Sequence, residues 1–364
     1  MRQTRTLTNK LFSLLINSNG ETLIKSKNEI IEGLGLDTLN INEHEGNNFE
    51  VYKYFEGEFE KLISTNAELY GIEPVIFYID NSTTCNAFAT KRNGYNIMGI
   101  TKGYPILIGN KFKNDFFDSL IFAAFLNNES VSDGFASLYK NENFSFSKFM
   151  LDCSIHFTFH HEFRHLLQFN AIKDKTDNHL TENCFERPFD LKKHILEYDA
   201  DKSAANKVEL YAASILRKFG FRTDGEFLAL IYCALGSLFI TRVLFNYGLV
   251  GQWQEPLKPN PMEFYTKKNW HPHPTIRALN LLDSFNVFIS DGYPNLKIET
   301  QKLITNSMGI TKLYLDKLLP NVDTAGLIFG DMFSEIEKSN EYNNYLHNEA
   351  LSDPIIQQLI DKSL

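Results

Sequence analysis

Residues 155–170 read IHFTFHHEFRHLLQFN and place four of the chain's ten histidines, with one carboxylate, on a single apolar stretch. Apolar residues recur at three-to-four spacing from residue 146 to residue 169, a pattern that is typical of a helix packed against a core. The same spacing predicts three further helices, over residues 116–126, 191–219 and 226–245. The stretch therefore sets several ionisable side chains on what we predict to be a core helix.

The composition is that of a globular chain without a nucleic-acid-binding surface. Hydrophobic residues make up 43% of the 364 residues and aromatic residues 13%, as expected of a chain with a sizeable core. The formal net charge is −9 and no basic stripe stands out, so we exclude binding to a phosphate backbone. Four cysteines without paired spacing predict reduced thiols and a cytoplasmic location: Cys85, Cys153, Cys184 and Cys233.

One stretch, FLALIYCALGSLFIT at residues 227–241, raises the question of a membrane span. It carries no charge and is closed by Glu226 and Arg242. A spanning helix needs about 20 apolar residues, and shorter runs are more often buried in a soluble core. We therefore expect a core helix here and no membrane span, although this stretch is the one membrane candidate.

Short β-prone runs, separated by glycine, proline and asparagine, follow one another between residues 71 and 110. They predict a small sheet with tight turns, built from residues 75–79, 87–90, 95–101 and 106–108. Residues 1–45 and the last 70 residues are predicted to be largely helical. A loop stiffened by proline, NWHPHP, precedes a helix for which Thr275 is the expected cap.

The motif H-E-x-x-H lies within the opening stretch, as His161, Glu162 and His165. Residues four apart share a face of a helix, so the two imidazoles can bind one metal ion. Glu162 lies about 100° further round the helix, beside the ion, where it can accept a proton from a bound water. This combination suits one Zn²⁺ ion. The alternative is a pair of core histidines satisfied by other partners.

Two histidines and a water leave one coordination position to fill. Gln168 stands where a third histidine would follow the motif, so the ligand has to come from elsewhere. In the segment EYDAD, Glu197 and Asp201 share a helix face. Glu197 can be the third ligand, and Asp201 can accept the other ring N–H of a ligand histidine. The alternatives are a solvated acidic face and, as a rival ligand, His194.

The loop HPHP places His271 and His273 close to Arg277. A donor from this group, aimed at the oxygen of an attacked peptide carbonyl, would stabilise the negative charge that develops there. The alternative is a pair of surface histidines in a proline-rich turn. His156 and His160 form a second pair at i, i+4 without an adjacent carboxylate, and we assign that pair to packing.

Taken in order, five segments resemble the gluzincin metallopeptidases of the HtpX and CAAX prenyl protease type. They are CNAFAT and YNIMGITKG in the predicted sheet, then HEFRH, EYDAD and HPHPTIR. The resemblance covers roughly residues 68–282. About 50 residues separate the predicted sheet from HEFRH, which is longer than the family pattern, and the last 80 residues have no counterpart in it.

The resemblance implies a zincin-like domain and a set of site residues. His161, His165 and Glu197 would bind zinc, Glu162 would act as the base, and Asp201 and Arg277 would support the ligands. His271 would assist near the scissile carbonyl, with His273 as its competitor. An edge strand that carries Tyr104, Ile106 and Ile108, or alternatively residues 97–101, would pair with an extended peptide substrate.

We therefore predict an α+β fold, mostly helical, with a small, mainly antiparallel sheet. Three parts are expected: an N-terminal helical segment at 1–50, a zincin-like metallopeptidase domain at 51–290, and a helical C-terminal extension at 291–364. The predicted function is that of a zinc-dependent endopeptidase acting on a protein or peptide. Two alternatives stay open: a stress or anti-phage effector protease with one host target, and a binding or regulatory protein with a structural zinc.

Overall fold

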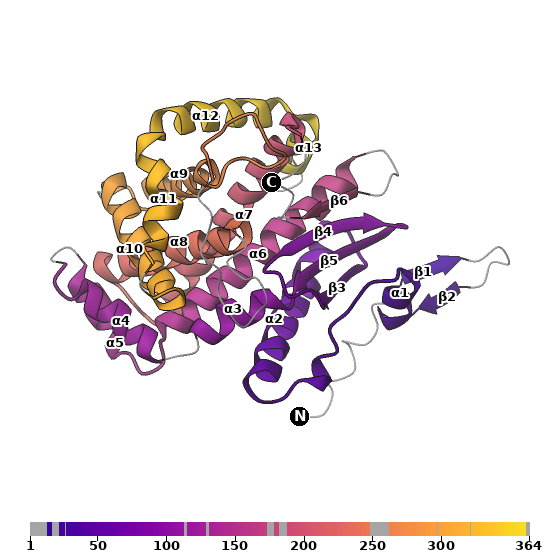
Figure 1. The fold of residues 1–364 in the computed structure, drawn as a ribbon, viewed down its shortest axis with the longest axis horizontal. Coiled ribbons are helices and arrows are strands. Elements are labelled where there is room, and N and C mark those ends of the chain that lie inside the picture. Colours follow the sequence, from indigo (N-terminus) through magenta and orange to yellow (C-terminus); the bar gives the residue numbers. More distant parts are fainter. Residues whose placement is uncertain are drawn as a thin grey trace.

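The computed structural model describes residues 13–16, 22–25, 27–112, 115–128, 131–172, 178–181, 188–247, 262–296, 298–320 and 322–361. Most of these residues lie in helices, and a small four-stranded sheet stands beside them (Figure 1). The α+β prediction is confirmed at this level. Cys184 lies outside the described residues, and the other three cysteines are buried free thiols.

The sheet is mixed, with strand order β3-β5-β4-β6. β3 (Val75–Asp80) runs parallel to β5 (Tyr95–Thr101), whereas β4 (Ala87–Arg92) is antiparallel both to β5 and to β6 (Asn178–Thr181). Asn93 and Gly94 join β4 to β5 with φ values of 50° and 81°. Positive φ at both central residues is the geometry of the tightest hairpin turns, and asparagine followed by glycine is the preferred pair there.

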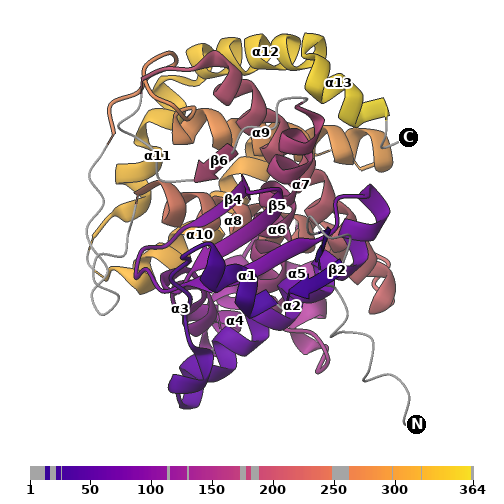
Figure 2. The ribbon, with the colours of Figure 1, turned by 90° about the vertical axis from the view of Figure 1, so that its right-hand side faces the viewer.

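Successive side chains of the strands point to opposite faces of the sheet, and both faces are covered. Phe77, Met98 and Ile100 join the main core, which includes α2 (Gly46–Tyr70) and α6 (Phe146–Ala171). Tyr78 and Ile97, one residue out of phase, pack with α1 (Lys27–Gly33). Turned by 90°, the sheet lies between α1 and α6 (Figure 2).

The expected substrate-edge strand is wrong. Tyr104, Ile106 and Ile108 lie in a helix, α3 (Gly103–Phe112), and all three are buried. A short apolar run that is buried on every side has no period that separates helix from strand. The alternative edge, residues 97–101, belongs to β5, which is paired on both sides by β3 and β4.

The predicted central helices are confirmed. They are α4 (Asp115–Phe125), α6, α7 (Leu191–Lys218) and α8 (Asp224–Tyr247). The helix after the HPHP loop, α9 (Pro274–Gly292), begins earlier than expected, because His273 is its N-cap and Pro274 fills its first turn. Thr275 is therefore not the cap, but it donates its backbone N–H to His273 Nδ1 at 3.2 Å.

The N-terminal segment differs from its prediction in part. Residues 13–25 contain an antiparallel hairpin, β1 (Ser13–Ile16) with β2 (Thr22–Lys25), and not a helix. The remaining described elements are helical, as expected: η1 (Ile41–Glu43), α5 (Ser132–Lys140), α10 (Thr300–Leu318), α11 (Thr324–Ser334), α12 (Ile336–Ser352) and α13 (Pro354–Asp361). Leu303, Ile310 and Tyr314 of α10 belong to the same core as α6 and α8.

The apolar helix α8 is long enough to cross a membrane, and its most apolar window has a mean hydropathy of 2.0. However, 94% of that window is buried among the other described elements, where α8 contacts α5, α6, α9 and α10. This burial agrees with the expected core helix. The cellular location stays a prediction.

Candidate metal centre

His161 and His165 come together one turn apart on α6. Both are fully enclosed, with 0% and 1% of their surface exposed. Their Nε2 atoms lie 3.0 Å apart, and the two rings are nearly perpendicular, at 87°. The two lone-pair positions therefore converge on one point beside the helix, as the i, i+4 spacing predicts.

Glu197 of α7 faces both rings. Its Oε2 lies 3.4 Å from His161 Nε2 and its Oε1 lies 3.3 Å from His165 Nε2. A tetrahedral zinc ion with bonds of about 2.0–2.1 Å separates its ligand atoms by about 3.3–3.4 Å. The two nitrogen–oxygen distances match that edge, and the nitrogen–nitrogen distance is slightly shorter. This buried group of three can bind one metal ion.

The Glu197 carboxylate is kept ionised by its surroundings. Complete burial favours the neutral acid, but Arg277, His271 and His165 outweigh it and hold the pKa of Glu197 well below its ordinary value. Arg277 contributes most among these three, with a terminal guanidinium nitrogen 2.8 Å from Glu197 Oε2. A ligand carboxylate must be deprotonated to bind a cation, so this charge arrangement prepares Glu197 for that role.

Asp201 lies one turn beyond Glu197 and faces the outer side of His161. Its Oδ1 is 3.0 Å from His161 Nδ1, a position from which it fixes the tautomer that leaves Nε2 free for a metal. Arg277 donates to both Asp201 oxygens, at 2.7 and 2.8 Å. Burial raises the pKa of Asp201, but Arg242 and Arg277 lower it further, so the carboxyl stays ionised.

Arg242 is a member of this cluster that the sequence analysis missed. It ends the apolar run of α8, is 2% exposed, and places a guanidinium nitrogen 3.2 Å from Asp201 Oδ1. Its guanidinium group also lies over the Phe157 ring at 4.8 Å. A charged residue at the end of a buried apolar helix needs a buried counter-ion, and that requirement is the signal that could have indicated it.

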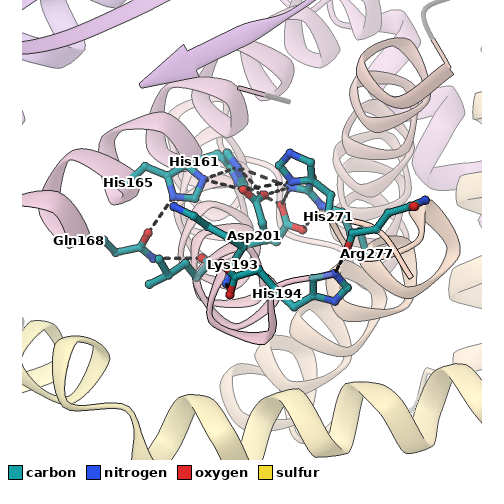
Figure 3. A network of polar contacts seen from close by, with 12 residues as sticks. His161, His165, Gln168, Lys193, His194, Asp201, His271 and Arg277 are labelled. Atoms are coloured by element: carbon teal, nitrogen blue, oxygen red, sulfur yellow. Dashed lines mark hydrogen bonds and ion pairs between the residues drawn. The ribbon is translucent and has the colours of Figure 1, made fainter. Parts of the chain in front are cut away.

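Gln168 is the second missed residue. Its Oε1 accepts a hydrogen bond from His165 Nδ1 at 2.7 Å, and its Nε2 donates to Leu196 O and to Asp199 Oδ2. Asp199 is in turn held by a bidentate pair with Arg164. Gln168 therefore orients His165 as Asp201 orients His161 (Figure 3). Its spacing of three from His165 on one helix face is the available signal.

The structure distinguishes the two histidines of the HPHP loop. His271 is buried and turns toward the centre, with Nδ1 3.4 Å from Glu197 Oε1. His273 instead caps α9 and packs between the Phe264 and Tyr265 rings. Burial lowers the pKa of His273 to about 4. The expectation that His273 takes a catalytic role is therefore not supported.

His194 is not a ligand of this centre. Its Nε2 lies 2.8 Å from Asn269 O and its Nδ1 lies 2.9 Å from the Tyr342 hydroxyl. Burial lowers its pKa to about 4, so the neutral ring donates to the carbonyl and accepts from the tyrosine. It thereby ties the loop that carries His271 to α7 and to α12.

Glu162 is 1% exposed on α6. By helical geometry it lies about 100° from His161 and about 60° from His165 around the axis, beside the face that carries both imidazoles. His156 and His160, assigned to packing, stack on the Tyr211 ring and meet the Phe159 ring edge-on. Burial lowers the pKa of both.

Comparison of this chain with protein-family models, with curated proteins and with solved structures gives no match. The functional argument therefore rests on the centre itself.

Proposed function

We propose that this protein is a zinc-dependent endopeptidase with a zincin-like domain. The observation that carries the proposal is the buried group of His161, His165 and Glu197, held at distances that suit a tetrahedral ion. Three protein ligands with a fourth position left for water or substrate are typical of catalytic zinc, whereas structural zinc has four protein ligands.

When bound, zinc acidifies a water molecule to a pKa of about 7 and polarises the substrate carbonyl. Within this chain, Glu162 accepts the proton as the nucleophile forms and passes it to the leaving amine. His271, turned toward the centre, is placed to donate to the developing oxyanion. Asp201 and Gln168 keep the two ligand rings in the tautomer that such a site requires.

Arg277 and Arg242 balance the charge of the centre. Two carboxylates, Glu197 and Asp201, and two guanidinium groups lie together with almost no exposed surface. Buried charges are stable when they are paired and hydrogen-bonded. Addition of a divalent cation to this neutral set leaves a net positive site, which favours an electron-rich carbonyl oxygen and a bound hydroxide.

The complete burial of the centre favours a second candidate function, that of a binding or regulatory protein with a structural zinc. All the residues named above are at most 2% exposed. The two functions differ in what Glu162 does, because a structural site has no use for a proton acceptor beside the ion.

Substitution Glu162→Gln separates the two. Wild type and variant are purified, their zinc content is determined by elemental analysis, and new protein termini are mapped in a cell lysate treated with each. We expect equal zinc content and loss of cleavage in the variant. Equal cleavage by both, or no cleavage by zinc-loaded wild type, would refute the peptidase. A single cleaved host protein would indicate the dedicated effector.

A further inference from the structure

A pocket of about 480 Å³ lies in the groove between α6 and α7 and is closed at one end by α12 and α13. His160, Phe163 and Leu167 line it from α6, and Lys202 and Lys207 line it from α7. None of the residues that converge on the metal centre contributes to it. The proposed peptidase function leaves this pocket unexplained.

The lining of the pocket is largely apolar. Phe163, Leu167 and Ile356 form buried walls. Leu210, Leu351 and Ile360 lie on its rim with 54%, 50% and 38% of their surface exposed. These are three of the nine large hydrophobic side chains that are exposed among the described residues. Their gathering around one concave site is typical of a ligand-binding surface, since scattered apolar residues are the norm elsewhere.

The charged groups of the pocket leave an excess of positive charge. Asp199 is the one carboxylate among the lining residues, and Arg164 neutralises it through two hydrogen bonds of 2.7 and 2.8 Å. Burial lowers the pKa of His160 well below its ordinary value, so that ring is neutral. Lys202 and Lys207, one on each side of Ser203 and Asn206 along α7, form no ion pair within the described chain and remain as two cations beside an apolar wall.

We propose that this pocket binds a single-chain amphiphilic carboxylate, of the free fatty acid type. The alkyl chain would lie against Phe163, Leu167 and Ile356, and the carboxylate would meet Lys202 and Lys207. The volume is that of a small-molecule site, which typically measures about 300–1,000 Å³. An apolar body with a charged end also explains why the rim is apolar while the cations stand on one helix.

Calorimetric titration of the full chain with dodecanoate, below its aggregation concentration, tests the proposal. Dodecanol and dodecylamine serve as neutral and cationic probes of the same chain length. We expect one site per chain for dodecanoate, at least about tenfold weaker binding of dodecanol, and no binding of the amine. Loss of two attractive charge contacts of about 0.5–1 kcal/mol each gives this factor.

Two double variants locate the site. Lys202→Glu with Lys207→Glu should weaken dodecanoate binding at least about tenfold, whereas Lys140→Glu with Lys218→Glu, an equal charge change at exposed lysines outside the pocket, should leave it within about twofold. Leu351→Ser with Ile360→Ser, at two exposed rim positions, should also weaken binding. Circular dichroism verifies that each variant is folded.

The proposal is overturned if dodecanoate does not bind, if all three probes bind alike, or if the charge reversal at the pocket has no more effect than the control pair. Binding of an acidic amphipathic peptide without binding of dodecanoate would also overturn it, and would assign the groove to a helical partner. None of these outcomes depends on zinc or on peptidase activity.

Discussion

At the scale of single residues, the metal centre depends on the groups behind its ligands. Gln168 Oε1 accepts from His165 Nδ1 at 2.7 Å while its amide is held by Leu196 and Asp199. Substitution Gln168→Ala removes this support and should weaken zinc binding by about 10–100-fold, as measured by competition with a chelator of known affinity. The exposed Gln301→Ala variant serves as control. Equal zinc affinity in wild type and Gln168→Ala would contradict the assigned role.

A second residue, Glu209, makes stability depend on pH. It is 1% exposed, and burial raises its pKa to about 7 although the Ser284 hydroxyl donates to it at 2.8 Å. The folded state therefore holds a proton that the unfolded chain releases near pH 4–5. The stability that this proton confers is complete below that range and is lost as the pH rises through about 7.

Glu209→Gln keeps the hydrogen bond and removes the titration. We expect the variant to gain up to about 3 kcal/mol of unfolding free energy relative to wild type between pH 5 and pH 8, measured by denaturant unfolding at both values. The exposed Glu337→Gln variant should show no such gain. A Glu209→Gln difference that is the same at both pH values would show that Glu209 is ionised in the folded protein.

The sequence anticipated most of these residues and missed others for physical reasons. His161, Glu162, His165 and Glu197 follow from spacing along a helix, because a helix fixes which side chains share a face. Arg242 and Gln168 act across elements or behind a ligand, and only the packed structure shows whom they meet. The choice between His271 and His273 depended on where α9 begins, and a one-residue shift at a helix cap reverses the two roles.

At the scale of elements, long helices were predictable and short apolar segments were not. α6, α7 and α8 carry many turns of periodic sequence, whereas residues 104–108 are too short and too uniformly buried to show a period. The hairpin of residues 13–25 was missed because its strands contain only four residues each. The mixed sheet was missed because a parallel β3–β5 pair depends on a connection that pattern alone does not reveal.

The placement of α8 in the core depends on a close approach to α5. A Cβ atom added at Gly134 would lie 2.1 Å from the carbonyl group of Gly225, which is backbone and cannot move aside. Gly134→Ala should therefore destabilise the protein by about 1–3 kcal/mol, as seen in thermal or denaturant unfolding. Gly57→Ala, at an open position in α2, should be neutral or stabilising. A stable Gly134→Ala protein would contradict the α5–α8 contact.

At the scale of the whole molecule, the centre joins elements from distant parts of the chain. α6 and α7 supply the ligands, α8 and α9 supply the two arginines, and α12 holds the His271 loop through Tyr342 and His194. The C-terminal helices, for which the sequence gave no function, thus help to shape the site. The division of the chain into three parts stays a prediction.

The most direct test of the central claim is zinc-edge X-ray absorption of the zinc-loaded protein. We expect two imidazole nitrogens and additional oxygen ligands at about 2.0–2.1 Å, with no sulfur, and loss of one imidazole in His165→Ala. A shell with three or more imidazoles, a sulfur ligand at about 2.3 Å, or a spectrum that His165→Ala leaves unchanged would contradict a centre built from His161, His165 and Glu197 with an open fourth position.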